Sequence, residues 1–120
     1  MEIFNFEKFI KMEIPTSGTY FRQDILTEEQ KAKKLGGMFF VIRPGHQVPL
    51  HYHTERETLI ICLSGEMTEI IEGKEVHLKP NDVMFILPGE KHTTVNRTDK
   101  ECRYLAYYSP PVFSDITEVK

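Results

Sequence analysis

Short apolar runs separated by turn residues make up most of the chain after Gly36. The run GMFFVI (37–42) ends at Arg43-Pro44-Gly45, and TLIICL (58–63) ends at Ser64-Gly65. The later runs of the same kind are EMTEII (66–71), EVHL (75–78), VMFIL (83–87), HTTVN (92–96) and CRYLAYY (102–108). Runs of this length, rich in β-branched and aromatic residues and bounded by Gly or Pro, predict an antiparallel sandwich or barrel.

The first 36 residues show a different pattern. FEKFIKMEI and TYFRQDIL both carry apolar residues, and we expect them to form one or two additional strands. Between residues 27 and 36 the spacing of Thr27 and Gln30 is that of a capping box, and Gly36 is placed to end a helix. The sequence therefore predicts an all-β fold with at most one short helix.

Length and charge limit the possible functions. A chain of 120 residues fits a single domain. The net charge of −3 argues against a nucleic-acid partner, which requires a clustered basic surface. No apolar run approaches the roughly 18 residues of a membrane span, and the first residues lack the apolar core of a secretory signal. Cys62 and Cys102 stand far apart in apolar runs, which indicates buried free thiols and a cytoplasmic protein.

Histidines supply the candidate chemistry. Three of the five histidines lie between Gly45 and Glu57. His51 and His53 are two residues apart, so on a strand their side chains point the same way. His92 follows another predicted strand, and three imidazoles from two strands can converge on a divalent Fe, Mn, Ni or Zn ion. We expect His46 to lie in an exposed turn and His77 to face outward from a hairpin.

Two stretches resemble the paired motifs of the cupin superfamily. GHQVPLHYHTERE (45–57) is similar to the first motif, a glycine and a His-x-His followed by a glutamate, and PGEKHTTVN (88–96) is similar to the core of the second. The matching residues are Gly45, His51 and His53 in the first motif, and Gly89, His92 and Asn96 in the second. Asn81 and Leu87 replace a glycine and a proline of the second motif, and asparagine also tolerates the left-handed turn.

The resemblance covers roughly residues 37–110 and implies a double-stranded β-helix, the cupin jelly-roll barrel, with a metal ion inside one end. In this arrangement residues 1–36 pack on the barrel as strands and a short helical turn, and residues 111–120 form a C-terminal tail.

The fourth metal ligand has two possible assignments. Counting back from Gly65 places Thr58 at the position of the family's glutamate, whereas counting forward from His53 allows either Glu57 or Thr58. Glu57 points inward only if the following strand carries an extra residue, such as a β-bulge. We favour a site of His51, His53 and His92 without Glu57, because that spacing needs no inserted residue.

The resemblance also frames the function. Cupins include oxygenases, isomerases, decarboxylases and non-catalytic modules, so the fold does not choose the chemistry. We expect a metal-dependent enzyme acting on a small organic molecule; the alternative is a non-catalytic module that binds or senses a small ligand. The exposed sheet edges of a small barrel, together with the Phe- and Ile-rich residues 1–26, also predict a homodimer.

Overall fold

The computed structural model describes residues 1–120 and contains ten β-strands, one α-helix and one short 3-10 helix. In the first half these are α1 (Phe6–Lys11), β1 (Tyr20–Leu26), the 3-10 helix (Glu28–Gln30), β2 (Gly36–Ile42), β3 (His51–Tyr52) and β4 (Glu57–Ser64). The second half contains β5 (Met67–Ile71), β6 (Lys74–Leu78), β7 (Val83–Ile86), β8 (His92–Val95), β9 (Cys102–Ser109) and β10 (Thr117–Glu118).

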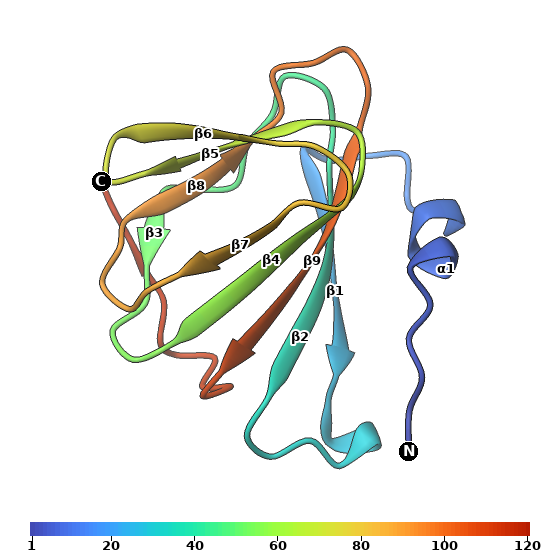
Figure 1. Ribbon diagram of the computed structural model, residues 1–120, viewed down its shortest axis with the longest axis vertical. Coiled ribbons are helices and arrows are strands. Elements are labelled where there is room, and N and C mark those ends of the chain that lie inside the picture. Colours follow the sequence, from blue (N-terminus) through green and yellow to red (C-terminus); the bar gives the residue numbers. More distant parts are fainter.

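Two five-stranded sheets face each other. Sheet I has the strand order β1-β2-β9-β4-β7, and sheet II has the order β10-β3-β8-β5-β6. Every pair of neighbouring strands is antiparallel. Figure 1 shows the two sheets as the walls of one barrel, with α1 on the far side of sheet I from sheet II. The predicted double-stranded β-helix is confirmed.

Sheet I is covered on both faces, which gives the protein two separate cores. On its inner face Ile42, Ile60 and Tyr104 belong to a cluster of ten buried residues inside the barrel. On its outer face Phe39 and Leu105 belong to a second cluster of six, which also includes Phe9 of α1. Because successive residues of a strand point to opposite faces, β2 is buried along almost its whole length.

The prediction of a strand over FEKFIKMEI is wrong, because Phe6–Lys11 form helix α1. The side chain of Asn5 caps this helix by accepting a hydrogen bond from the backbone N–H of Glu7 at 2.8 Å. Lys11 forms an ion pair with Glu7 one turn away. Phe9 turns toward sheet I, where its ring centroid lies 5.1 Å from that of Phe39. The other predicted strand of this region is confirmed as β1.

The turn after β1 is shorter than the sequence predicts. Thr27 and Gln30 form the expected capping box, but the 3-10 helix ends at Lys31, which adopts the left-handed conformation with φ 60°. Gly36 does not end a helix and instead begins β2. A Cβ atom at position 36 would lie 2.2 Å from the ring of Tyr108, so the glycine allows Tyr108 to pack against the β2 backbone.

Candidate metal centre

His51 and His53 lie in and just after β3, the short strand of sheet II that the chain forms between β2 and β4 of sheet I. His51 begins the two-residue strand β3, and His53 follows β3 directly. Across the sheet His51 is paired with His92, the first residue of β8. Strand geometry turns His51 and His53 to one side, and the register with β8 brings His92 beside them.

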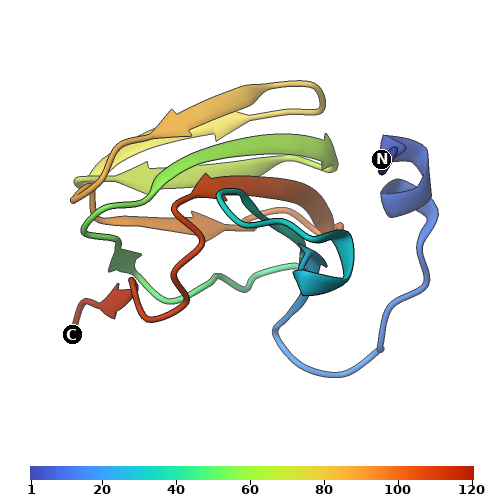
Figure 2. The same cartoon turned by 90° about the horizontal axis from the view of Figure 1, so that it is seen from below.

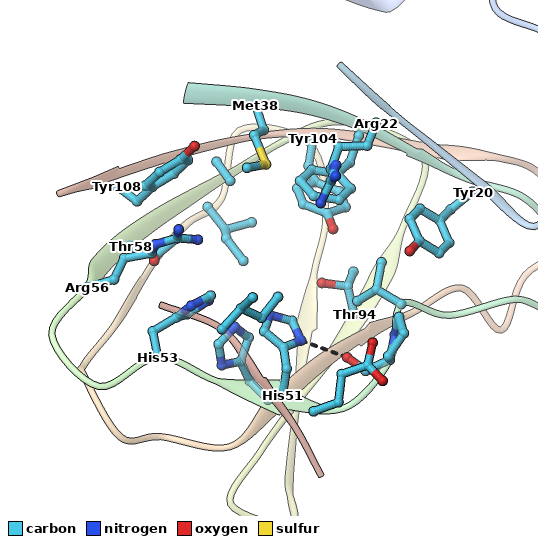
Figure 3. A pocket seen from close by; sticks show the side chains of 18 of the residues that line it. Tyr20, Arg22, Met38, His51, His53, Arg56, Thr58, Thr94, Tyr104 and Tyr108 are labelled. Carbon is cyan, nitrogen blue, oxygen red and sulfur yellow. Dashed lines mark hydrogen bonds between the residues drawn. The ribbon is translucent and has the colours of Figure 1, made fainter. Parts of the chain in front are cut away.

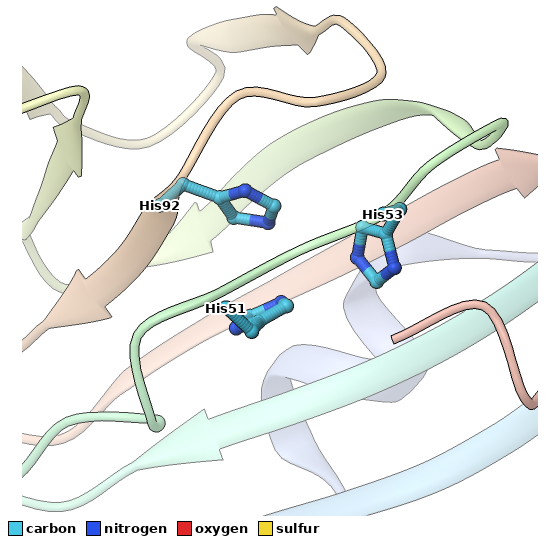
Figure 4. A group of neighbouring side chains, drawn as sticks. All are labelled: His51, His53 and His92. Atoms are coloured by element: carbon cyan, nitrogen blue, oxygen red, sulfur yellow. The ribbon is translucent and has the colours of Figure 1, made fainter. Parts of the chain in front are cut away.

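The three imidazoles converge as the sequence predicts. One nitrogen from each ring lies within 4.8 Å of the corresponding nitrogens of the other two. The ring centroids are 4.3 Å apart for His51 and His92, 5.0 Å for His51 and His53, and 5.5 Å for His53 and His92. Figure 4 shows the rings directed toward a common space between β3 and β8.

Each imidazole is oriented by a hydrogen bond to a backbone carbonyl. The Nδ1 atom of His51 lies 2.6 Å from the carbonyl oxygen of Pro49, and that of His92 lies 2.9 Å from the carbonyl oxygen of Glu90. His53 Nδ1 contacts the carbonyl oxygen of Asp115 in the same way. A carbonyl oxygen can only accept, so each Nδ1 carries the proton and each Nε2 keeps its lone pair, the arrangement that orients metal-binding histidines.

Burial keeps these rings neutral. Desolvation lowers the pKa of His53 and of His92 to about 4, and it also lowers the pKa of His51. A neutral imidazole is the form that donates a lone pair to a metal ion. Three convergent nitrogen donors with an adjacent open space are typical of metal sites that leave a coordination position for substrate or water. The donor set therefore fits a divalent transition metal.

Glu57 lies outside this group, whereas Thr58 faces the same cavity as the histidines. Glu57 is exposed at the start of β4, and the Thr58 side chain, 6% exposed, lines the cavity without a hydrogen-bond partner for its Oγ1 atom. A β-bulge is present in β4, but it falls between Cys62 and Ser64, after the inward residues Thr58 and Ile60. It therefore does not turn Glu57 inward.

A cavity of about 320 Å³ opens beside the three histidines. Ten of its 19 lining residues are hydrophobic, which is typical of a pocket for a small organic ligand. Figure 3 shows His51 and His53 at one wall, with Arg56 and Thr58 between His53 and Tyr108. The apolar walls come mainly from sheet I, through Met38, Phe40, Ile60 and Ala106.

The C-terminal segment closes this end of the barrel and orients part of the site. Its strand β10 pairs with β3, and Phe113, Ile116 and Glu118 line the cavity. The Asp115 carboxylate accepts hydrogen bonds from the backbone N–H groups of residues 54, 55 and 56 and from the Thr54 hydroxyl. These bonds hold its pKa well below the usual range. Figure 2 shows this segment beside β3, on the opposite side of the molecule from α1.

Sequence reasoning missed two ionisable groups inside the barrel. Arg56 lies between two glutamates, a run of charges typical of a solvated loop, yet it is only 7% exposed and lines the cavity. Glu69 is fully buried, and its carboxyl accepts a hydrogen bond from the Thr94 hydroxyl. Burial raises the Glu69 pKa to about 8. Strand alternation was the available signal for Glu69, since its neighbours Met67 and Ile71 also pack into the inner core.

The other sequence expectations around the site agree with the structure. His46 is exposed, and His77 faces outward, where its Nε2 lies 3.5 Å from Glu66. Cys62 and Cys102 are buried free thiols. The Asn96 amide donates hydrogen bonds to the carbonyl oxygens of residues 42 and 100, the structural role expected at a strand end.

Comparison with known proteins places this barrel in a family. The model of the cupin domain family matches residues 38–108, more than half of the chain. The chain is 30% identical over 70 residues to H2HPP isomerase of Bacillus subtilis, and 35% identical over 63 residues to an oxalate-binding protein of Thermotoga maritima. These matches cover 58% and 52% of this chain, but only 29% and 52% of the two relatives.

A solved structure agrees over the full length. A double-stranded β-helix protein from Klebsiella pneumoniae superposes with a TM-score of 0.81 at 19% identity, covering 100% of this chain and 98% of the other. The match of the cupin domain model to residues 38–108 shows that the chain belongs to the cupin family. No helix in it has both the length and the apolar character needed to cross a membrane.

Proposed function

We propose that this cupin is a metal-dependent enzyme that holds one divalent transition metal ion on His51, His53 and His92 and acts on a small organic molecule in the adjacent cavity. The observation that carries the proposal is the convergence of three nitrogen donors within 4.8 Å at the wall of a cavity of about 320 Å³. Fe(II), Mn(II), Ni(II) and Zn(II) all suit imidazole ligands. Glu57 is left out of the proposed ligand set.

The chain's own residues would bind and orient the substrate. The apolar residues of sheet I, such as Met38 and Ile60, exclude water from one side of the cavity. Thr58 presents a hydroxyl without a protein partner beside the histidines. When bound, a divalent ion supplies Lewis acidity toward a carbonyl or enolate oxygen, and a redox-active ion also supports oxygen chemistry. Oxygenase, isomerase and decarboxylase reactions are the classes that this combination serves.

A non-catalytic binding module is the second candidate. It is favoured by the name of one relative, the oxalate-binding protein, whereas the relative named as an isomerase favours an enzyme. The two functions place the same demands on the cavity, and they differ in whether the bound molecule is converted.

Anaerobic reconstitution with Fe(II), followed by incubation with small diketones, thiols and organic acids, separates the two. Oxygen uptake and product formation by NMR are followed together, because isomerases and decarboxylases consume no oxygen. We expect one compound class to be converted by the wild type and not by His92→Ala. Ligand-induced thermal shifts without conversion of any compound would instead establish the binding module.

The proposal includes a homodimer and a cytoplasmic location. The outer face of sheet I is uncovered at its β4–β7 edge, where Leu59, Val83 and Phe85 are 42%, 57% and 50% exposed. An edge strand with apolar side chains beside it is a typical pairing surface. Phe85→Lys should convert the dimer to a monomer by light scattering, and a monomeric wild type at micromolar concentration would contradict this. Two free thiols support a reducing compartment.

A further inference from the structure

Arg56 is a buried cation whose guanidinium group forms no ion pair with a carboxylate. Its side chain is enclosed between β9 and the C-terminal segment: the guanidinium carbon lies 4.0 Å from the centroid of the Tyr108 ring, and Nη2 donates a hydrogen bond to the Val112 carbonyl oxygen at 3.0 Å. A guanidinium carries five N–H groups that can donate hydrogen bonds. In Arg56 the Nη2–H group that faces Val112 is the one with an acceptor in the protein. The buried Nε–H has no partner in the protein.

The second buried arginine, Arg103, shows how this protein satisfies a structural guanidinium. Arg103 forms an ion pair with Glu101 at 2.8 Å and donates two further hydrogen bonds to the carbonyl oxygens of Phe9 and Met12. The Asp115 carboxylate lies near enough to raise the pKa of Arg56, but its oxygens accept hydrogen bonds from backbone N–H groups and form no ion pair with the guanidinium. A buried charge without a partner is costly, so the position of Arg56 suits a negatively charged ligand.

Arg56 lines the same cavity as the three histidines. Figure 3 shows its guanidinium beside His53 and Thr58, facing the space that the imidazoles border. The remaining charged groups at the cavity, Arg22 and Glu118, are exposed and of opposite sign. Burial lowers the Arg56 pKa, and an anion in the cavity would offset that cost. The cavity thus offers one buried positive charge, neutral imidazoles and apolar walls.

We infer that Arg56 recognises the substrate, and that the substrate class is small organic carboxylates. The inference rests on the proposed function. The carboxylate is held by the planar N–H edge of Arg56, a geometry that matches its two oxygens, while the rest of the molecule lies against Met38 and Ile60 near the histidines. A phosphate group would bring up to two charges to a cavity with one buried cation and no lysine in its lining.

Matched acids and amides test the inference. The protein is loaded with Zn(II), its metal content is measured, and binding of mandelate, mandelamide, lactate, lactamide and inorganic phosphate is followed by calorimetry. We expect the wild type to bind each acid at least about tenfold more tightly than its amide, in line with one charge-assisted pair. Arg56→Met should remove that preference while retaining stoichiometric zinc, and Arg56→Lys should keep only part of it.

Controls separate the alternatives. Arg97→Met removes an exposed arginine that pairs with Glu75 away from the cavity, and it should leave the preference unchanged. Equal binding of acid and amide, tighter binding of phosphate than of the acids, or loss of preference in Arg22→Met instead of Arg56→Met would overturn the inference. A wild type that binds no zinc but prefers acids through Arg56 would refute the proposed metal site and leave this inference standing.

Discussion

On the outer face of sheet I, Phe39 and Leu105 pack beneath α1 in an apolar cluster, whereas on the inner side Thr58 of β4 and Arg56, just before β4, line a cavity. The buried side-chain nitrogen and oxygen atoms that lack a hydrogen-bond partner in the protein lie mostly inside the barrel. Of four such atoms, three belong to residues of the barrel interior, namely Arg56, Thr58 and Glu69, and the fourth to Arg43 at the end of β2. Buried polar atoms without a protein partner are uncommon, and a bound water, ion or ligand is the usual explanation. Sheet I therefore packs against α1 through its outer face and borders the cavity through its inner face.

The largest effect is expected on the outer face. Phe39→Ala removes a fully buried ring that contacts Phe9 and Phe21, and it should lower the free energy of unfolding by about 3–5 kcal/mol. Urea denaturation measures the change, and Phe6→Ala, at a 43% exposed position in α1, serves as the control with little effect. Metal content should be unchanged. Loss of metal from folded Phe39→Ala protein would contradict the claim that the outer face of sheet I does not affect the metal site.

Titration of Glu69 in the barrel interior should have a smaller effect on the free energy of unfolding, and this effect should depend on pH. Its pKa is raised from 4.5 to about 8, so between these values the unfolded chain loses the proton and the folded protein keeps it. The contribution of Glu69 to stability is then highest below pH 4.5, falls as pH rises toward 8 by on the order of a few kcal/mol, and levels off above. Below about pH 6.5 the lowered pKa values of His53 and His92 act in the opposite direction.

Glu69→Gln removes the titrating group, so the stability advantage of the wild type over this variant should shrink as pH rises in denaturation curves recorded from pH 5 to 9. Glu57→Gln, at an exposed position, should keep the wild-type slope. A Glu69→Gln protein with an unchanged slope would show that another group is responsible.

The smallest effect concerns the inward position next to the histidines. Thr58→Glu places a carboxylate at the cavity and should tighten Mn(II) binding by about tenfold, because a carboxylate favours harder ions. Leu59→Glu introduces the same charge one residue further on, on the exposed outer face, and should leave the Mn(II) dissociation constant unchanged. If both variants bound Mn(II) more tightly to the same degree, the added negative charge of the protein would explain the change, and the position of Thr58 at the cavity would not.

The barrel and the histidine cluster were predictable because they depend on local patterns. Short apolar runs between turns define the strands, and the two-residue spacing of His51 and His53 defines a shared direction. Asn81 also behaves as expected, with φ 77° in the left-handed region. The apolar residues of FEKFIK did not predict a helix, because a six-residue segment fits both the helical and the strand period. The Asn5 cap and the packing of Phe9 on Phe39 decide the structure of this segment.

The rest of the site depends on contacts between distant parts of the chain. Asp115 reaches the loop at Thr54, 61 residues earlier, and no sequence pattern links the two. Arg56 lies between two glutamates in the sequence, and only the enclosure by Tyr108 and Val112 makes it a buried residue. Arg56 is two residues before Thr58, so strand alternation would have placed both side chains on the same side. Alternation alone does not predict that the Arg56 side chain is buried.

The most direct test is metal analysis of protein purified without chelator or added metal, for the wild type, His92→Ala and Glu57→Gln. We expect close to one divalent transition metal ion per chain in the wild type and in Glu57→Gln, and none in His92→Ala, with all three proteins folded by circular dichroism. A metal-free Glu57→Gln protein would place Glu57 among the ligands. A His92→Ala protein with stoichiometric metal would contradict the three-histidine centre.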